Sequence, residues 1–280
     1  MASVRRNKIR DFFVIFIVCM KKDSFGWKSA AYACQRFMKV EEQGLIFATS
    51  DIHGYPLDSF LGLLEKAGFS ESDQLYVIGD VIDRNGDGGV AMLRWMMRQE
   101  NVTLLKGNHE AMMLECEFAL STDVDLTNLR LVTIEQEFHL LRWHRNGCLK
   151  TLESLLKLRD EDPDELVKLV KYVRSAPLYM EVAVPMKRFV LVHGGLNGFE
   201  PGKGLDEYDE DDLLWTRPGT EERYWEDRMV ILGHTPTQYI GGEKGKMFVT
   251  DTWADIDTGA AGGGSPMLLR LDDMCPFYAE

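Results

Sequence analysis

Histidine, aspartate and asparagine recur beside glycine in five short polar segments of this chain. Four of its six histidines lie there, namely His53, His109, His193 and His234, each near the end of an apolar run. Imidazole nitrogens combined with carboxylate and amide oxygens, without thiolates, suit manganese, iron or zinc better than calcium. A lone histidine is usually a surface or core residue, but this repeated placement predicts a metal centre.

The first two segments offer two carboxylates and an imidazole for cation binding. Asp51 and His53 are two residues apart on an extended stretch, so both side chains can project toward the same side and reach one cation. Asp80 ends the next predicted strand, and its two carboxylate oxygens could bridge two cations. The residue types therefore favour a pair of metal ions that share one aspartate.

The remaining ligand candidates come from later in the chain. Asn108 can add a neutral amide oxygen without adding charge, and His193 and His234 each follow an apolar run in the second half. Glycines beside these residues permit the tight turns and close backbone approach that a crowded centre needs. The six residues form a candidate site for two divalent cations, with manganese as the first expectation and iron or zinc as alternatives.

Short apolar runs must deliver these residues to one place. Buried strands are predicted at residues 45–49, 75–78 and 102–105, and the spacing of apolar residues predicts helices at 56–67 and 90–99. Three successive strand-loop-helix units favour a parallel sheet whose strand ends carry the ligands. Residues 111–177 have a mostly helical pattern. Further strands are predicted at residues 178–184, 189–192, 229–232, 247–250 and 267–271.

Composition limits the classes of partner. The 280 residues carry a formal net charge of -13, which argues against an extended surface for nucleic-acid phosphates. Any bound anion must therefore be held locally, by metals or a few arginines. Five widely spaced cysteines without a CxxC pair fit a reducing cytoplasm better than a disulfide framework. We expect a cytoplasmic protein with buried or incidental thiols and no stable membrane association.

The first 37 residues stand apart from this pattern. An apolar run at residues 12–20 lies between basic residues, like the core of an export signal, but no small-x-small cleavage site follows it. The run is also shorter than the roughly 20 residues that a membrane helix needs. We favour an N-terminal extension at residues 1–37 and a catalytic domain at 38–280. An anchor or export signal, or an integral structural element, stays open for the first segment.

The five segments, in their order, resemble the motifs of the phosphoprotein phosphatase family within the calcineurin-like metallophosphoesterase superfamily. They are Ser-Asp-Ile-His-Gly, Gly-Asp-Val-Ile-Asp-Arg-Asn-Gly, Gly-Asn-His-Glu, Val-His-Gly-Gly and Gly-His-Thr, starting at residues 50, 79, 107, 192 and 233. The likeness is to bacterial-type serine/threonine phosphatases and spans residues 46 to about 260. It implies an α/β fold, a four-layer α/β/β/α sandwich with helices outside and the metals at one edge of the strands.

Two positions depart from the family pattern. Ser50 stands where the family usually has glycine, which a loop should tolerate. Asn85 replaces the usual glycine after the Asp-Arg pair, at a position where asparagine can also adopt left-handed backbone angles. Neither departure removes a predicted ligand.

The resemblance implies how the metals are shared. The first would be held by Asp51, His53 and Asp80, and the second by Asp80, Asn108, His193 and His234. A water molecule activated between them would attack phosphorus in line. A two-metal site suits this reaction because it lowers the pKa of bound water and neutralises the phosphate oxygens.

The resemblance also implies roles in proton transfer and phosphate binding. His109 would protonate the leaving alkoxide, with Asp83 holding its imidazole and favouring the charged form. Arg84 would clamp the phosphate together with Asn108. Arg217, after a Leu-Trp segment, is the candidate for a second clamp, and a surface ion pair is the rival interpretation of that residue.

The predicted activity is hydrolysis of phosphomonoesters, with a serine/threonine phosphoprotein or a small phosphoester as substrate. A symmetrical dinucleoside tetraphosphate hydrolase shares all five motifs and is the main alternative. Ten carboxylates between residues 206 and 227 would oppose a tetraphosphate unless they face away from the site. An inactive metal-binding regulatory protein is a weaker alternative because every expected ligand is present. A nuclease is disfavoured by the acidic charge.

Overall fold

The computed structural model describes residues 44–122 and 132–279. The predicted N-terminal extension, residues 1–37, lies outside the described residues. The residues from Leu45 onward group into one unit. Within the described ranges, no helix has the length and apolar character needed to cross a membrane.

The first sheet contains the three predicted strand-loop-helix units. Its strands are β1 (Ile46–Thr49), β2 (Gln74–Ile78), β3 (Val102–Leu105), β9 (Met267–Arg270) and β10 (Cys275–Tyr278), in the order β10-β9-β1-β2-β3. β1, β2 and β3 are parallel, as predicted. β9 and β10 extend the sheet antiparallel beside β1. The sequence pattern did not indicate β10. The parallel register brings the loops after β1, β2 and β3 out at one edge.

The second sheet comes from the second half of the chain. Its strands are β4 (Tyr179–Val184), β5 (Lys187–Val192), β6 (Met229–Leu232), β7 (Phe248–Val249) and β8 (Trp253–Asp255), in the order β4-β5-β6-β8-β7. β5, β6 and β8 run parallel, and the two edge strands are antiparallel to their neighbours. The predicted strand at 247–250 is shorter than expected, and β8 was not among the predicted strands.

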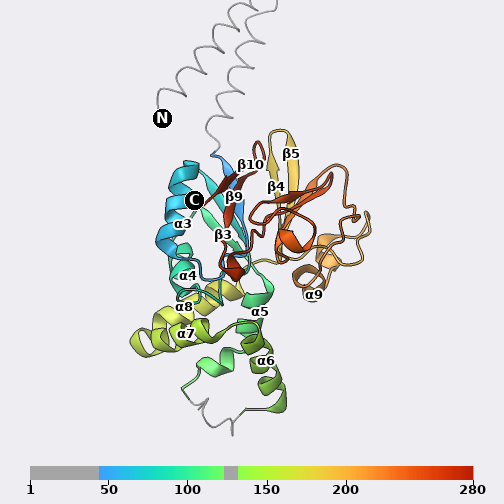
Figure 1. Cartoon of the computed structure of the whole chain (residues 1–280). Coiled ribbons are helices and arrows are strands. Elements are labelled where there is room, and N and C mark those ends of the chain that lie inside the picture. The colour runs from blue at the N-terminus through green and yellow to red at the C-terminus, as the bar shows by residue number, and fades with distance from the viewer. Residues whose placement is uncertain (1–43, 123–131, 280) are drawn as a thin grey trace, which may run out of the picture. The chain divides into compact units, whose positions relative to one another are not determined.

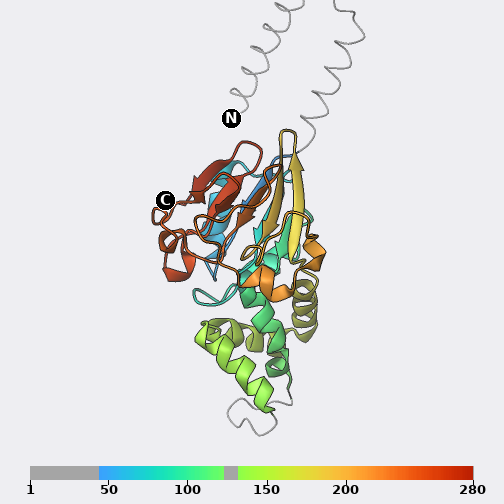
Figure 2. The ribbon, with the colours of Figure 1, turned by 90° about the vertical axis from the view of Figure 1, so that its right-hand side faces the viewer.

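Helices cover the outer face of the first sheet and continue beyond one end of both sheets. They are α3 (Leu57–Ala67), α4 (Val90–Met96), α5 (Asn108–Glu115), α6 (Ile134–Arg145), α7 (Leu149–Glu161) and α8 (Pro163–Arg174). Figure 1 shows α3 and α4 beside the first sheet, and Figures 1 and 2 both show α6 and α7 past the strand ends. The predicted helical region 111–177 is therefore confirmed in its described parts.

Local sequence explains where several of these helices begin and end. α3 ends at Gly68, whose left-handed conformation lets its backbone N–H reach the carbonyl of Glu65. α6 begins at a capping box. The Thr133 hydroxyl accepts from the backbone N–H of Gln136, and the Gln136 side chain accepts from the backbone N–H of Thr133. α8 begins with Pro163 directly after its N-cap.

Alternating strand residues separate the layers. In β1, Phe47 packs against the helices while Ala48 packs between the two sheets. In β5, Leu191 faces the first sheet while Val190 faces the outer side of the second. That outer side is covered by loop segments and the short helix α9 (Glu210–Leu214). The predicted four-layer α/β/β/α order is confirmed, with a fourth layer made mainly of loop.

Candidate metal centre

Left-handed backbone conformations are concentrated in the loops that carry the predicted site. Among the described residues, positive φ angles at non-glycine positions occur at Asp51, His53, Asp80, Asp83, Arg84, His234 and Met274. All but the last are predicted site residues. Such angles cost roughly 1–3 kcal/mol each and persist where the surrounding structure enforces them. Here the first loop is tied to the second, since the His53 N–H donates to the Asp80 carbonyl at 2.9 Å.

Glycines allow these loops to approach one another closely. A Cβ atom on Gly79 would lie 2.5 Å from the backbone of Gly107, and one on Gly107 would lie 2.3 Å from Asp80 Oδ1. Real Cβ atoms do not come this close to other atoms. The prediction that glycine permits a crowded centre is therefore confirmed for these two residues.

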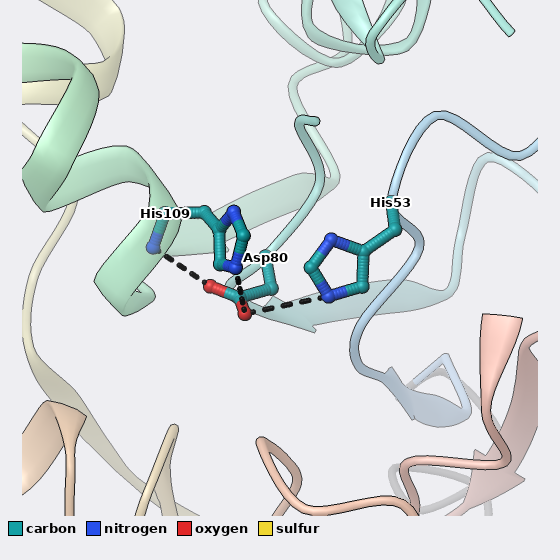
Figure 3. Close-up of side chains that lie close together, drawn as sticks. All are labelled: His53, Asp80 and His109. Atoms are coloured by element: carbon teal, nitrogen blue, oxygen red, sulfur yellow. Dashed lines mark hydrogen bonds and ion pairs between the residues drawn. The ribbon is translucent and has the colours of Figure 1, made fainter. Parts of the chain in front are cut away.

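Asp80 lies at the middle of the site. Figure 3 shows its carboxylate between the rings of His53 and His109. Asp80 Oδ2 is 3.5 Å from His53 Nε2 and 3.7 Å from His109 Nε2, and Asp80 Oδ1 is 3.3 Å from His193 Nε2. Potential ligand atoms cluster in two groups, with Asp80 common to both: His53, Asp80 and His109, and Asp80, His193 and His234. This arrangement is what a bridging carboxylate requires.

Asp51 connects the first loop to His234. Its Oδ2 accepts from the His234 backbone N–H at 2.8 Å and also contacts the hydroxyl of Ser50. Asp51 Oδ1 lies 3.7 Å from His53 Nε2. The serine that replaces the usual family glycine is thus accommodated, and its hydroxyl contacts a predicted ligand.

Hydrogen bonds orient two of the histidine rings. His53 Nδ1 donates to the Ile82 carbonyl at 3.0 Å, and His193 Nδ1 donates to the Ile78 carbonyl at 2.9 Å. These contacts leave Nε2 of each ring directed into the site, where His193 Nε2 is 2.9 Å from Asn108 Oδ1. A metal-binding histidine is commonly oriented in this way, with its second nitrogen on a backbone carbonyl.

Burial and nearby aspartates set the charge of these groups. Burial alone would lower the pKa of both His53 and His193, but the aspartates outweigh it and raise the pKa of His53 to about 9 and that of His193 to about 10. Burial and the neighbouring His193 lower the pKa of His234 to about 3. Burial opposes ionisation of Asp80, yet the surrounding histidines hold its pKa well below the usual range. Cation binding at His53 and His193 would therefore displace protons.

The residues present fit a pair of divalent cations. Two buried atoms of the site, Asp51 Oδ1 and His234 Nε2, have no hydrogen-bond partner among the described residues. A buried polar atom without a hydrogen-bond partner lowers the stability of the fold by roughly 1–3 kcal/mol, and a bound cation would remove this cost. Both belong to predicted metal ligands, and the nitrogen and oxygen donors around them suit a divalent transition metal.

A second buried pair lies beside the cluster. His109 Nδ1 donates to Asp83 Oδ2 at 2.6 Å, and both side chains are almost fully buried. Asp83 is therefore positioned to hold the imidazole of His109, as the sequence predicts. The next residue, Arg84, is exposed at the cleft over the site.

The sequence matches the family described as calcineurin-like phosphoesterase over residues 44–256. The chain belongs to this family. The superfamily expected from the five motifs is thereby confirmed. The finer assignment to bacterial-type serine/threonine phosphatases stays a prediction.

Curated relatives of this chain are named as symmetrical bis(5'-nucleosyl)-tetraphosphatases. The chain is 26% identical over 152 residues to one from Acidovorax sp. (strain JS42), and 26% identical over 153 residues to one from Glaesserella parasuis serovar 5 (strain SH0165). Each match covers 54% of this chain and 44% of the relative. The chain therefore matches less than half the length of these proteins.

Two solved structures are also similar to this chain. One is a Saccharomyces cerevisiae protein serine/threonine phosphatase with similarity to human phosphatase PP5, at TM-score 0.48 and 15% identity, covering 96% of both chains. The other is named "putative diadenosine tetraphosphatase", at TM-score 0.54 and 17% identity, covering 84% of this chain and 92% of the other. The latter likeness supports the fold of two mixed sheets with flanking helices.

An open cleft of about 730 Å³ lies over the candidate centre. Arg84 and Arg217 line it, and neither forms an ion pair with any described residue. The rival interpretation of Arg217 as half of a surface ion pair therefore finds no partner in the described part of the chain. Trp215 and Tyr239 also line the cleft, and Tyr239 is 74% exposed.

Two residues at the site are not among the predicted site residues. Glu110 is fully buried and accepts from the backbone N–H groups of Asp80 at 2.8 Å and Gly107 at 2.9 Å, which fixes the second loop to α5. Its presence in the third motif was the available signal. Asp257 lines the cleft, and its carboxylate accepts from the Gly259 N–H at 2.8 Å, which stabilises the turn at residues 257–259.

Asn85 behaves differently from the expectation. It is not among the described residues with positive φ, whereas Asp83 and Arg84 are. Its side-chain amide instead donates to the carbonyls of His53 at 3.0 Å and Ala260 at 2.9 Å. The asparagine therefore links the first loop to the segment between β8 and β9, because its side chain supplies two donors that glycine lacks.

The cysteines are not paired within the described residues. Cys116 and Cys148 are free and buried, and burial raises the pKa of each thiol to about 12. Cys275 is free and half-buried. The expectation of buried or incidental thiols is confirmed for these positions, while Cys19 and Cys34 lie outside the described residues.

Proposed function

We propose that this phosphoesterase hydrolyses dinucleoside polyphosphates with the help of two divalent cations, of which manganese is the expected metal. The observation that carries the proposal is the lining of the cleft. Arg84 and Arg217 offer guanidinium groups without an ion-pair partner among the described residues to a chain of phosphates, and Trp215 and Tyr239 offer flat surfaces on which bases can stack. The curated relatives that match this chain are named for such an activity.

The positions of the acidic residues remove the main objection to this substrate. Ten carboxylates between residues 206 and 227 give the sequence-based reason to prefer phosphomonoesters. None of the ten lines the cleft. Those at residues 209–212 line a separate groove that shares only Trp215 with the cleft. A tetraphosphate in the cleft would therefore meet arginines rather than these carboxylates.

Each predicted site residue has a role in this proposal. Asp51, His53 and Asp80 would hold one cation, and the other would be held by Asp80, Asn108, His193 and His234. When bound, such cations lower the pKa of water and neutralise phosphate oxygens. Asn108, Arg84 and Arg217 would orient the phosphates. His109 would give a proton to the departing oxygen while Asp83 holds its ring.

The serine/threonine phosphoprotein is the second candidate substrate, and one observation favours it. The hydrogen bond of 2.6 Å between His109 and Asp83 prepares a general acid. A serine or threonine alkoxide needs protonation to leave, whereas a nucleotide phosphate is a much better leaving group. A phosphomonoester substrate therefore accounts for the His109–Asp83 pair more directly than a dinucleotide substrate does.

A comparison of substrates tests the proposal. We expect kcat/KM for diadenosine tetraphosphate to exceed that for a phosphoserine or phosphothreonine peptide at the same manganese concentration. Tyr239→Ala should lower the dinucleotide value by roughly 5- to 100-fold, because base stacking contributes about 1–3 kcal/mol. It should leave the peptide value nearly unchanged.

Phe138→Ala is the matched control, because Phe138 is an exposed aromatic residue of α6 that does not line the cleft. This variant should leave kcat/KM unchanged for both substrates. A preference for the peptide, with no selective effect of Tyr239→Ala, would reject the dinucleotide and favour the second candidate.

A further inference from the structure

Asp83 is the centre of a buried hydrogen-bond network that extends beyond the predicted site. Its Oδ2 accepts from His109 Nδ1 at 2.6 Å and from Trp143 Nε1 at 2.8 Å. Its Oδ1 accepts from the Thr151 hydroxyl at 2.6 Å. Asp83, Trp143 and Thr151 are all 0% exposed. A buried carboxylate is costly unless both oxygens are paired, and these donors pair both.

The two additional donors come from neighbouring helices. Trp143 lies in the last turn of α6 and Thr151 in the first turn of α7. The Thr151 hydroxyl oxygen also accepts from the Asp83 backbone N–H at 2.9 Å. Between the helices, the Gly147 carbonyl accepts from the Arg84 N–H at 3.0 Å. The α6–α7 pair therefore holds the side chain of Asp83 and the backbone of both left-handed residues, Asp83 and Arg84.

Close backbone approach makes this contact possible. A Cβ atom on Gly88 would lie 2.2 Å from the backbone nitrogen of Thr151. The Asp83 N–H also reaches the Gly88 carbonyl, at 3.1 Å. The start of α7 is thus packed directly onto the loop that follows β2, with no room for a side chain between them.

We infer that Trp143 and Thr151 are positioning residues for the general acid, because they fix the rotation of the Asp83 carboxylate against His109. Donors on two different helices hold the two carboxylate oxygens, so the group cannot turn about its Cβ–Cγ bond without breaking a buried hydrogen bond. His109 Nδ1 then stays on Oδ2, and Nε2 keeps the proton that is transferred. This inference rests on the proposed role of His109.

A purely structural role for the two residues predicts a different result. Loss of packing alone would reduce the amount of active enzyme, and the loss would be the same for every substrate. Loss of acid positioning would instead depend on the leaving group, because only poor leaving groups need protonation in the transition state.

The test compares phenyl phosphate, which has a poor leaving group, with p-nitrophenyl phosphate, which has a good one. Thr151→Val and Trp143→Phe should each lower kcat/KM for phenyl phosphate by about 10-fold or more, within the range known for groups that orient a ligand. The values for p-nitrophenyl phosphate should stay within about 2-fold of the parent. Thr151→Ser, which retains the hydroxyl, should restore the phenyl phosphate rate.

Two further variants serve as references. Leu155→Ala removes a fully buried side chain of α7 that forms none of these hydrogen bonds, and it should lower stability without changing the ratio of kcat/KM between the two substrates. His109→Asn should show the largest selective loss. When Thr151→Val is added to His109→Asn, the ratio of kcat/KM for phenyl phosphate to that for p-nitrophenyl phosphate should fall no further, because both changes act through the same proton transfer.

The outcomes separate this inference from the role on which it rests. If His109→Asn lowers kcat/KM for both substrates by the same factor, the general-acid role of His109 is wrong, and the inference about Trp143 and Thr151 is wrong with it. If His109→Asn is selective while Thr151→Val and Thr151→Ser behave alike, only the positioning role is overturned. The valine and serine pair decides this point even if Trp143→Phe does not fold.

Discussion

Substitution of Asp80 by asparagine is the sharpest test of the proposed two-metal site. The variant keeps the shape of the side chain but removes its negative charge and turns one oxygen into an amide nitrogen that cannot bind a cation. Asp80 Oδ1 is 3.3 Å from His193 Nε2, and Asp80 Oδ2 is 3.5 Å from His53 Nε2. Each oxygen thus faces the ligands of a different predicted metal. We expect Asp80→Asn to weaken the binding of both metals and to abolish turnover.

The burial of Asp80 sets the size of the effect. Its side chain is only 3% exposed, so solvent compensates little for the lost charge. Removing one partner of a buried charge pair costs about 3–5 kcal/mol, which corresponds to roughly 100- to 4000-fold in a dissociation constant. Both metals should therefore dissociate at concentrations that saturate the parent protein.

Elemental analysis after equilibration with manganese, together with turnover measurements, checks this expectation. Asp73→Asn provides a matched control, because Asp73 is a buried aspartate outside the cleft whose carboxylate accepts from the Leu45 and Ser70 N–H groups. That variant should keep its metals. Two full metal equivalents and normal turnover in Asp80→Asn would refute the bridging role.

Three further predictions concern phosphate binding, protons and the N-terminal segment. Arg217→Gln should keep its metals and lower kcat/KM by roughly 10- to 100-fold, as expected for a lost charged hydrogen bond of about 1.5–3 kcal/mol; steady-state kinetics with no change would remove Arg217 from the clamp. Manganese should bind more weakly at pH 6 than at pH 8, because His53 and His193, with pKa values of about 9 and 10, hold protons that the metal must displace. Calorimetric titrations that agree at the two pH values would contradict this. A chain beginning at Met38 should fold and keep full activity, since every predicted site residue lies beyond it; an insoluble product, or an inactive one with its metals bound, would show that residues 1–37 belong to the domain.

Sequence patterns predicted the first sheet better than the second. The runs that form β1, β2 and β3 are each followed within a few residues by a polar motif, so strand and site indicated one another. β10 lies far from this pattern and pairs with β9, and its position could not be inferred from Cys275 to Tyr278 alone. β8, only Trp253–Asp255, is too short to give a periodic signal.

The candidate site residues could be proposed from the sequence because the motifs that contain them are local. Asp51 with His53, and Asn108 with His109, sit together in short glycine-flanked loops, and parallel strands carry such loops to one edge. The outward position of the ten acidic residues was not predictable. It depends on how the loop 196–228 packs against the outer face of the second sheet.

The sequence by itself therefore determined the family, the candidate metal-binding residues and the three parallel strands β1, β2 and β3 that precede the first three motifs. Only the tertiary structure decided what holds Asp83, because Trp143 and Thr151 lie 60 and 68 residues further along the chain. The physical reason is that hydrogen bonds between distant side chains follow from helix packing and burial. No spacing along the sequence records which donor will face a given carboxylate once the chain has folded.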